Sequence, residues 1–235
     1  MKKVLPSAAE AVKGISDGAT VLIGGFGVCG VPENLVTALR QSGKKGLTIV
    51  SNNVGLDEFG IGTLLRNGQI KKMILSYGGE SKAFEEMALS GKLEVEWTPQ
   101  GTLAERLRAG GAGIAGFYTP TGYGTPVAEG KETRQFDGRW HVFERALKAD
   151  FALIKAWKGD SFGNLIYRKT ARNFNQVMAT AAGRVLAEVE SLLMVGGLDP
   201  NNIHTPGVYV DGLFQGQSYV KPIEKLTLRK AATHA

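Results

Sequence analysis

Short apolar runs recur along the chain, and the first two are each followed by a polar or glycine-rich turn. The run Thr20–Ile23 opens into the glycine loop, which we define as residues 24–30. Pro32 then fits the first turn of a helix that ends at Ser42-Gly43, and the next apolar run is Leu47–Val50. A strand, a helix and a strand in this order form a βαβ unit, which predicts two parallel strands.

Apolar periodicity and turn residues predict the remaining elements in the same way. Helices are expected at residues 7–15, 60–67, 81–89, 102–109 and 173–182. Strands are expected at residues 72–76, 93–97, 150–155, 186–189 and 208–210. Residues 110–124 form a predicted glycine-rich loop, and Asp137-Gly138 between two alternating segments predicts a β-hairpin. No repeat or linker interrupts this order, so we expect one domain over residues 1–235.

Composition narrows the class of protein. The 235 residues are 43% hydrophobic and 21% charged, which is typical of a globular domain, and 32 of them are glycine, about twice the usual ~7%. The net charge of +6 is spread over short basic pairs, which favours a phosphorylated small ligand over nucleic acid. A single cysteine excludes a disulfide within the chain. No signal peptide and no membrane-spanning apolar run is found, so we expect a cytoplasmic protein.

The glycine loop resembles a dinucleotide-binding turn at first sight, because Gly25, Gly27 and Gly30 satisfy G-x-G-x-x-G after a strand. That turn also requires an acidic residue at the end of the next strand to hold the ribose. Here the next strand ends in Ser51-Asn52-Asn53, with no acid. An NAD-dependent oxidoreductase is therefore kept only as the weakest alternative.

The segment from Asp17 to Pro32 has a more specific pattern: Asp-Gly, two residues, three apolar residues, Gly-Gly-Phe, three residues, Gly, one residue, Pro. This pattern resembles the first signature of the class I coenzyme A transferases. The likeness continues across most of the chain, and Gln176 stands where a proline is expected. The matching segments resemble the A subunits of the succinyl-CoA:3-ketoacid group; they are Ser51-Asn52-Asn53, Thr98 to Arg106, Pro120 to Thr125, Glu129 to Glu132 and Lys169 to Phe174.

The resemblance implies an α/β fold of the CoA-transferase or NagB-RpiA-like kind. It has an open, mostly parallel sheet with helices on both faces and a small β-rich excursion. It also implies a transferase that moves CoA between succinyl-CoA and a 3-oxoacid such as acetoacetate through a glutamyl-CoA intermediate. The family's nucleophilic glutamate lies in a Ser-Glu-Asn-Gly motif, which this chain lacks. A B subunit is therefore expected to supply the glutamate, in an α2β2 assembly.

The resemblance also implies the site residues of this half of the enzyme. Asn52, Asn53 and Gln100 are expected to support the catalytic glutamate. The expected contacts to CoA, a substrate moiety rather than a permanently bound cofactor, are Gly24, Gly25, Phe26, Gly27, Val28, Cys29 and Gly30. Cys29 itself is expected to be a small buried thiol. His141, His204 and His234 show no metal-ligand spacing, so no metal is expected.

Several alternatives remain open from the sequence. The same motifs occur in the A subunits of 3-oxoadipate and acetate/acetoacetate CoA-transferases, although Gly78-Gly79-Glu80 and Ile223-Glu224-Lys225 favour the succinyl/acetoacetate group. From a different class, a stand-alone sugar-phosphate isomerase or a ligand-binding module on a similar fold also fits the pattern of strands and helices.

Overall fold

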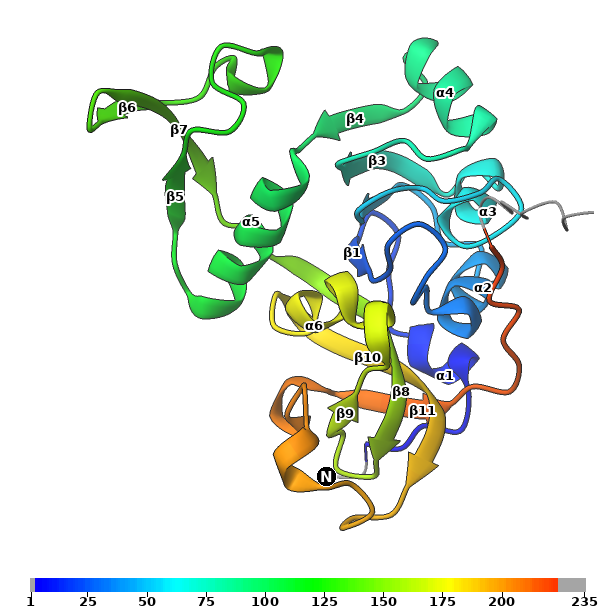
Figure 1. Cartoon of the computed structure of the whole chain (residues 1–235). Helices are drawn as coiled ribbons and strands as arrows, with labels where there is room; N and C mark the ends of the chain where they lie inside the picture. The colour runs from blue at the N-terminus through cyan, green and yellow to red at the C-terminus, as the bar shows by residue number, and fades with distance from the viewer. Residues whose placement is uncertain (1–2, 224–235) are drawn as a thin grey trace, which may run out of the picture.

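A parallel β-sheet forms the centre of the computed structural model, which describes residues 3–223 (Figure 1). Its strand order is β11-β10-β8-β1-β2-β3-β4, and all neighbours in this order run parallel, while β9 pairs antiparallel with β8. The predicted α/β fold with an open, mostly parallel sheet is therefore confirmed. Three residues named in the sequence analysis lie outside the described residues. They are Glu224 and Lys225, which favoured the succinyl/acetoacetate group, and His234, which showed no metal-ligand spacing.

The main sheet and the helices follow one another along the chain. The strands of the main sheet are β1 (Thr20–Ile23), β2 (Leu47–Val50), β3 (Ile70–Leu75), β4 (Glu94–Trp97), β8 (Ala149–Asp160), β9 (Leu165–Ile166), β10 (Ala182–Leu193) and β11 (Gly212–Gln215). The α-helices are α1 (Ala8–Val12), α2 (Glu33–Gln41), α3 (Ile61–Arg66), α4 (Lys82–Leu89), α5 (Gln100–Ala112) and α6 (Asn173–Met178). Short 3-10 helices lie at Pro126–Ala128, Lys169–Arg172, Pro200–Asn202 and Gly207–Tyr209.

Helices cover both faces of the sheet, as predicted. On one face, α1 to α4 bury apolar side chains such as Leu35 and Leu64 against Val21 and Ile23 of β1. On the other face, α5 and α6 pack on the cluster that contains Leu22. Because β1 is buried on both sides, its four residues form a continuous run with no polar face beyond Thr20.

Two of the predicted elements are wrong. Residues 208–210 are not a strand: Gly207–Tyr209 is a 3-10 helix with Val208 84% exposed, and the strand is β11, whose Leu213 is fully buried. Residues 110–124 are not a continuous loop, because α5 extends to Ala112 and β5 (Gly116–Thr119) follows. Gly116 is needed for packing rather than for a turn, since a Cβ there would lie 2.4 Å from the Phe143 ring.

The β-rich excursion is a three-stranded antiparallel sheet in the order β5-β7-β6, which we call the arm (β6 Thr133–Phe136, β7 Arg139–Arg145). It projects away from the main sheet (Figure 1). Its hairpin turn is the predicted Asp137-Gly138, both with positive φ (48° and 74°), as a type I′ turn requires. Arg106 of α5 joins the arm to the main sheet: its Nε donates to the Arg145 carbonyl at 3.0 Å and its Nη1 to Glu96 of β4 at 2.8 Å.

The order of the strands marks where a ligand is expected. From β1 the chain moves to β2, β3 and β4 on one side, whereas β8, β10 and β11 lie on the other side. In open α/β sheets, ligands bind at the carboxyl ends of the strands at such a reversal. The glycine loop follows β1, Asn52 and Asn53 follow β2, and Gln100 follows β4.

Candidate functional site

The three amide side chains expected at the site lie together and form one hydrogen-bonded chain, the amide relay (Asn52, Asn53 and Gln100). Gln100 Nε2 donates to Asn52 Oδ1 at 2.7 Å, and Asn52 Nδ2 donates to Asn53 Oδ1 at 3.2 Å. Asn53 Oδ1 also accepts the backbone N–H of Gly27 at 2.9 Å. The relay therefore links the ends of β2 and β4 to the glycine loop.

A backbone group sets the direction of this relay. The N–H of Gly27 can only donate, so the atom of Asn53 that faces it must be the oxygen. Asn52 then has to turn its nitrogen toward Asn53 and its oxygen toward Gln100. Asn52 and Asn53 are 2% and 4% exposed, whereas Gln100 is exposed, so the relay begins in the interior and ends at the surface.

The exposed end of the relay has hydrogen-bonding capacity to spare. One N–H of Gln100 is used by Asn52, which leaves its second Nε2–H and its Oε1 without a bond in the part of the chain that the structure describes. An oriented neutral amide of this kind can donate to a developing oxyanion or hold a carboxylate. Gln100 is thus the member of the relay that can touch a substrate.

The glycine loop is a tight turn. The N–H groups of Phe26 and Cys29 donate to each other's carbonyl oxygens, both at 3.0 Å, and Gly27 inside the turn has φ 58°. Phe26 lies at the turn and is 50% exposed, so an aromatic ring stands beside the amide relay. Our expectation that Cys29 is buried is wrong: the turn directs it outward, and its Sγ lies 3.6 Å from Thr170 Oγ1.

Two asparagines of α6 hold the loop from the opposite side. The fully buried Asn175 donates from Nδ2 to the Gly30 carbonyl at 2.9 Å and accepts the Lys155 N–H at 2.9 Å. Asn173 donates to the Cys29 carbonyl at 3.0 Å. Gly24 is required here, because a Cβ at that position would lie 1.9 Å from Asn175 Oδ1. The sequence pattern indicated no role for Asn173 or Asn175 beyond their place at the start of the helix predicted at residues 173–182.

Buried charges lie beside the end of the loop, where α2 begins. Pro32 gives α2 no side-chain cap, and Glu188 of β10 accepts the Leu35 N–H at 2.8 Å instead. Glu188 is fully buried, and burial raises the pKa of its carboxyl group to about 7. Lys155, which lies opposite Glu188 on β8, is 3.7 Å from Glu33 and 3.5 Å from Glu190.

The amide relay opens into a surface groove of about 470 Å³, which we call the α5–α6 groove. It lies between the tip of the glycine loop and the two helices of that face. Its lining residues are Phe26, Gln100, Gly101, Ala104, Glu105, Arg108, Asn173, Phe174 and Val177. Gln100 of the relay, Phe26 of the loop and the start of α6 therefore line one opening.

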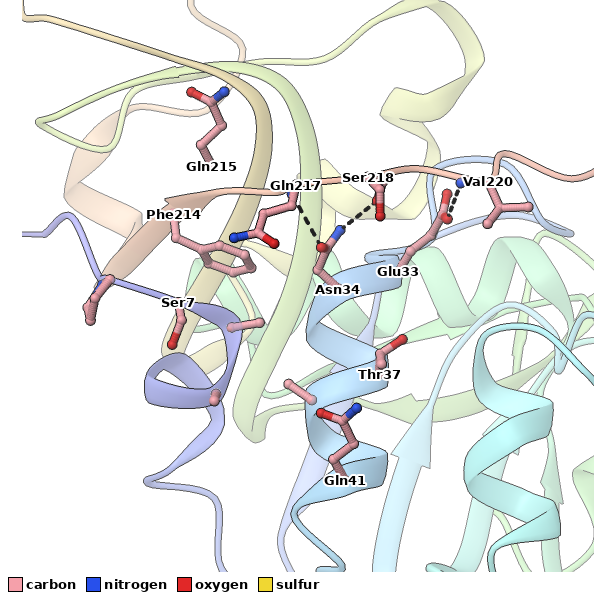
Figure 2. Close-up of a pocket in the computed structure, with 14 residues that line it drawn as sticks. Ser7, Glu33, Asn34, Thr37, Gln41, Phe214, Gln215, Gln217, Ser218 and Val220 are labelled. Carbon is pink, nitrogen blue, oxygen red and sulfur yellow. Dashed lines mark hydrogen bonds between the residues drawn. The ribbon is translucent and has the colours of Figure 1, made fainter.

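A second cleft, of about 370 Å³, lies between α1, α2 and the segment that follows β11 (Figure 2). Figure 2 shows this segment crossing the start of α2, where Asn34 donates to the Ser218 carbonyl at 3.2 Å and Glu33 accepts the Val220 N–H at 2.7 Å. No residue of the amide relay lines this cleft. Its contacts fix the start of α2 and do not add to the site.

Within residues 3–223, no helix is both long and apolar enough to cross a membrane. The same residues contain no group of three or more His, Cys, Asp or Glu side chains placed to hold a metal ion.

The fold and the amide relay agree with the class of protein that the sequence comparisons show. The profile of the Coenzyme A transferase family matches residues 5–216, so the chain belongs to the coenzyme A transferases. Among solved structures, the acyl-CoA transferase YdiF from Escherichia coli O157:H7 superposes with a TM-score of 0.83 at 26% identity. That match covers 95% of this chain and 50% of the YdiF chain.

Individual relatives point to one kind of transferase. The chain is 58% identical to the A subunit of a probable succinyl-CoA:3-ketoacid coenzyme A transferase of Bacillus subtilis, covering 99% of this chain and 98% of that protein. The A subunit of the Helicobacter pylori (strain J99) succinyl-CoA:3-ketoacid coenzyme A transferase is 53% identical, covering 98% and 100%. The human mitochondrial succinyl-CoA:3-ketoacid coenzyme A transferase 2 is 51% identical over 94% of this chain, but only 46% of that protein is matched. These findings confirm the predicted family and agree with the predicted enzyme.

Proposed function

We propose that this chain is the A subunit of a CoA-transferase that moves CoA between succinyl-CoA and a 3-oxoacid, acetoacetate in particular. The observation that carries the proposal is the amide relay, which ends in the exposed Gln100 beside the glycine loop. The names of relatives at 51–58% identity support the acid pair. CoA takes part as a substrate moiety and is not a permanently bound cofactor.

In the proposed reaction, a glutamate on the partner chain attacks the thioester carbonyl of succinyl-CoA. The C–S bond breaks, giving an acyl-glutamyl anhydride and CoA thiolate, and the thiolate then attacks the glutamyl carbonyl to release succinate. The resulting glutamyl-CoA thioester passes CoA to acetoacetate by the reverse steps. Each attack puts negative charge on a carbonyl oxygen, and in our proposal the second N–H of Gln100, which Asn52 does not use, donates to that oxygen.

Within the relay, Asn52 and Asn53 orient Gln100 rather than touch the substrate, because both are almost fully buried. The glycine loop contacts CoA through its exposed turn around Phe26 to Cys29. These roles follow from the hydrogen bonds of the relay and from the resemblance to the family.

We further propose that a B subunit completes the site in an α2β2 assembly. The human relative supports a two-part enzyme, since this chain matches 46% of its length and the remainder is available for a second part. The open α5–α6 groove beside Gln100 leaves room for the partner's glutamate. We also propose that residues 1–235 act as one domain and that the enzyme is cytoplasmic.

Co-expression with a B subunit that carries Ser-Glu-Asn-Gly tests the proposal. The isolated chain should be inactive, and the assembly should convert succinyl-CoA and acetoacetate to acetoacetyl-CoA, measured by absorbance of the product's enolate. Parallel assays with 3-oxoadipate and acetate test the acid pair. Activity of the isolated chain on a sugar phosphate would overturn the proposed class, and a preference for 3-oxoadipate would overturn the proposed substrate alone.

A further inference from the structure

The α5–α6 groove has a polar end, an apolar middle and a charged end. Gln100, Ala104 and Arg108 line it and are spaced four residues apart, so they lie on one face of α5. Eight residues of helix separate Gln100 from Arg108 by about 12 Å along the axis. Side chains on a helix lean toward its N-terminus, so both side chains point the same way, and the longer Arg108 side chain reaches back toward Gln100.

The middle of the groove suits methylene groups. Ala104, Phe174 and Val177 line it and offer carbon atoms without a charge. Phe174 is 7% exposed and belongs to the cluster of buried side chains below α5 and α6, so this wall of the groove is fixed by packing. An acyl chain lying here would replace water on an apolar surface.

The charged end of the groove holds one anion-binding group. Glu105 and Arg108 are the charged residues of the lining, and Arg108 Nε donates to Glu105 Oε2 at 2.7 Å. A guanidinium has five N–H donors, and within residues 3–223 only the one on Nε is engaged. The edge formed by its two Nη nitrogens remains available for a carboxylate in the forked geometry that arginine favours.

We propose that Arg108 binds the distal carboxylate of the succinyl group while Gln100 holds the thioester oxygen, which makes Arg108 a specificity-determining residue. This inference rests on the proposed function. The succinyl group carries a free carboxylate two methylenes beyond the thioester carbonyl, whereas the acetoacetyl group carries an uncharged ketone. A cation at the far end of the groove therefore favours one of the two acyl groups, while Gln100 serves both.

The test is the variant Arg108→Gln in the assembled enzyme. In a reaction with a covalent enzyme intermediate, kcat/KM for each substrate reports its own half-reaction. We expect kcat/KM to fall about tenfold or more for succinyl-CoA and succinate, because a charge-assisted hydrogen bond is lost. For acetoacetyl-CoA and acetoacetate it should stay within about twofold. Arg108→Lys keeps the positive charge but loses the forked geometry, so its kcat/KM for succinyl-CoA and succinate should lie between those of wild type and Arg108→Gln.

Lys13→Gln is the matched control, since Lys13 also pairs with a glutamate three residues earlier (Glu10, 3.7 Å) on an exposed helix face away from the groove. It should change neither half-reaction. An equal fall in kcat/KM for succinate and for acetoacetate in Arg108→Gln would overturn the proposal. Arg108 would then act on assembly or on a step that both acids share. An unchanged kcat/KM for succinyl-CoA would overturn it as well.

A binding measurement separates this proposal from the proposed function. Calorimetric titration of succinate into the assembled wild-type and Arg108→Gln proteins reports the carboxylate site without turnover. Weaker succinate binding by the variant supports the site even if the wild-type assembly transfers no CoA, a result that would count against the proposed function. Equal succinate binding by both proteins overturns the site whatever the activity.

Discussion

The glycine loop and the helix that follows it are held by two different kinds of chemistry. On the side of β2 and β4, the neutral amide relay reaches Gly27. On the side of β10, the buried carboxyl group of Glu188 holds the start of α2, close to Lys155 and Glu33. Amides do not titrate, whereas a buried carboxyl group does. The charge of the amide relay, which includes the exposed Gln100, is thus independent of pH. The charge of Glu188, which anchors the start of α2, changes with pH.

The largest effect should come from Gly24→Ala, which displaces Asn175, the side chain of α6 that holds the end of the glycine loop. Its Cβ would lie 1.9 Å from Asn175 Oδ1, so Asn175 must move and its bonds to Gly30 and Lys155 are lost. Overpacking and unsatisfied buried groups together predict a loss of about 4 kcal/mol in the free energy of unfolding. Urea denaturation measures it. Gly101→Ala, inside α5 with open space around it, should instead be neutral or stabilising.

Glu188→Gln tests the charged side. The folded pKa of about 7 lies above the ordinary value of 4.5, so the native state retains a proton that the unfolded state has released between these pH values. This group's contribution to stability is therefore present below pH 4.5 and is lost as the pH rises through 7.

The variant lacks this loss. The free energy of unfolding of Glu188→Gln, relative to that of wild type, should rise by about 3 kcal/mol at most between pH 5 and pH 8. Urea titrations at each pH measure it. The groups that face Glu188, namely Lys155, Glu33 and Tyr219, are the same in both proteins. A stability difference that stays constant across this range would show that Glu188 does not titrate there.

Gln100→Ala tests the neutral side. Removing the one amide of the relay that is exposed should lower kcat of the assembled enzyme about 100-fold, as loss of an oxyanion donor does. Assembly, followed by size-exclusion chromatography, should be intact, because Gln100 lies at the surface. An unchanged kcat would remove Gln100 from the site. A bell-shaped pH profile that keeps its shape in the variant would agree with a neutral donor.

The smallest effect is expected for Cys29→Ser. The thiol is exposed, and the turn is closed by backbone bonds between Phe26 and Cys29 that a serine retains. Both kcat and the free energy of unfolding should therefore stay close to wild type, within about twofold and about 0.5 kcal/mol. A large loss of activity would mean that the loop depends on the sulfur itself and not on its backbone.

The sequence predicted the elements whose signals are local. Thr20–Ile23, Leu47–Val50 and the Asp137-Gly138 hairpin were located correctly, and α4 lies within the predicted residues 81–89. The resemblance to the family pointed to the three amides that the structure brings together, and their catalytic roles stay predictions.

Contacts between distant parts of the chain were not predictable in this way. Strands β8 and β10 are each twelve residues long, although apolar runs suggested six and four. Charged residues interrupt the apolar pattern, but Lys155 and Glu188 lie opposite each other in the paired strands and continue the ladder. Asn175 and Glu188 reach the loop and α2 from more than a hundred residues away, so no local pattern could assign them.

One side chain, Arg106, connects the arm to the helix that begins with Gln100. Arg106 is bonded to Arg145 of the arm and to Glu96 of β4, and its own backbone belongs to α5, six residues after Gln100. The same side chain therefore fixes the arm, the edge strand β4 and the helix that begins with Gln100, so Arg106 couples the position of the arm to that of the candidate site.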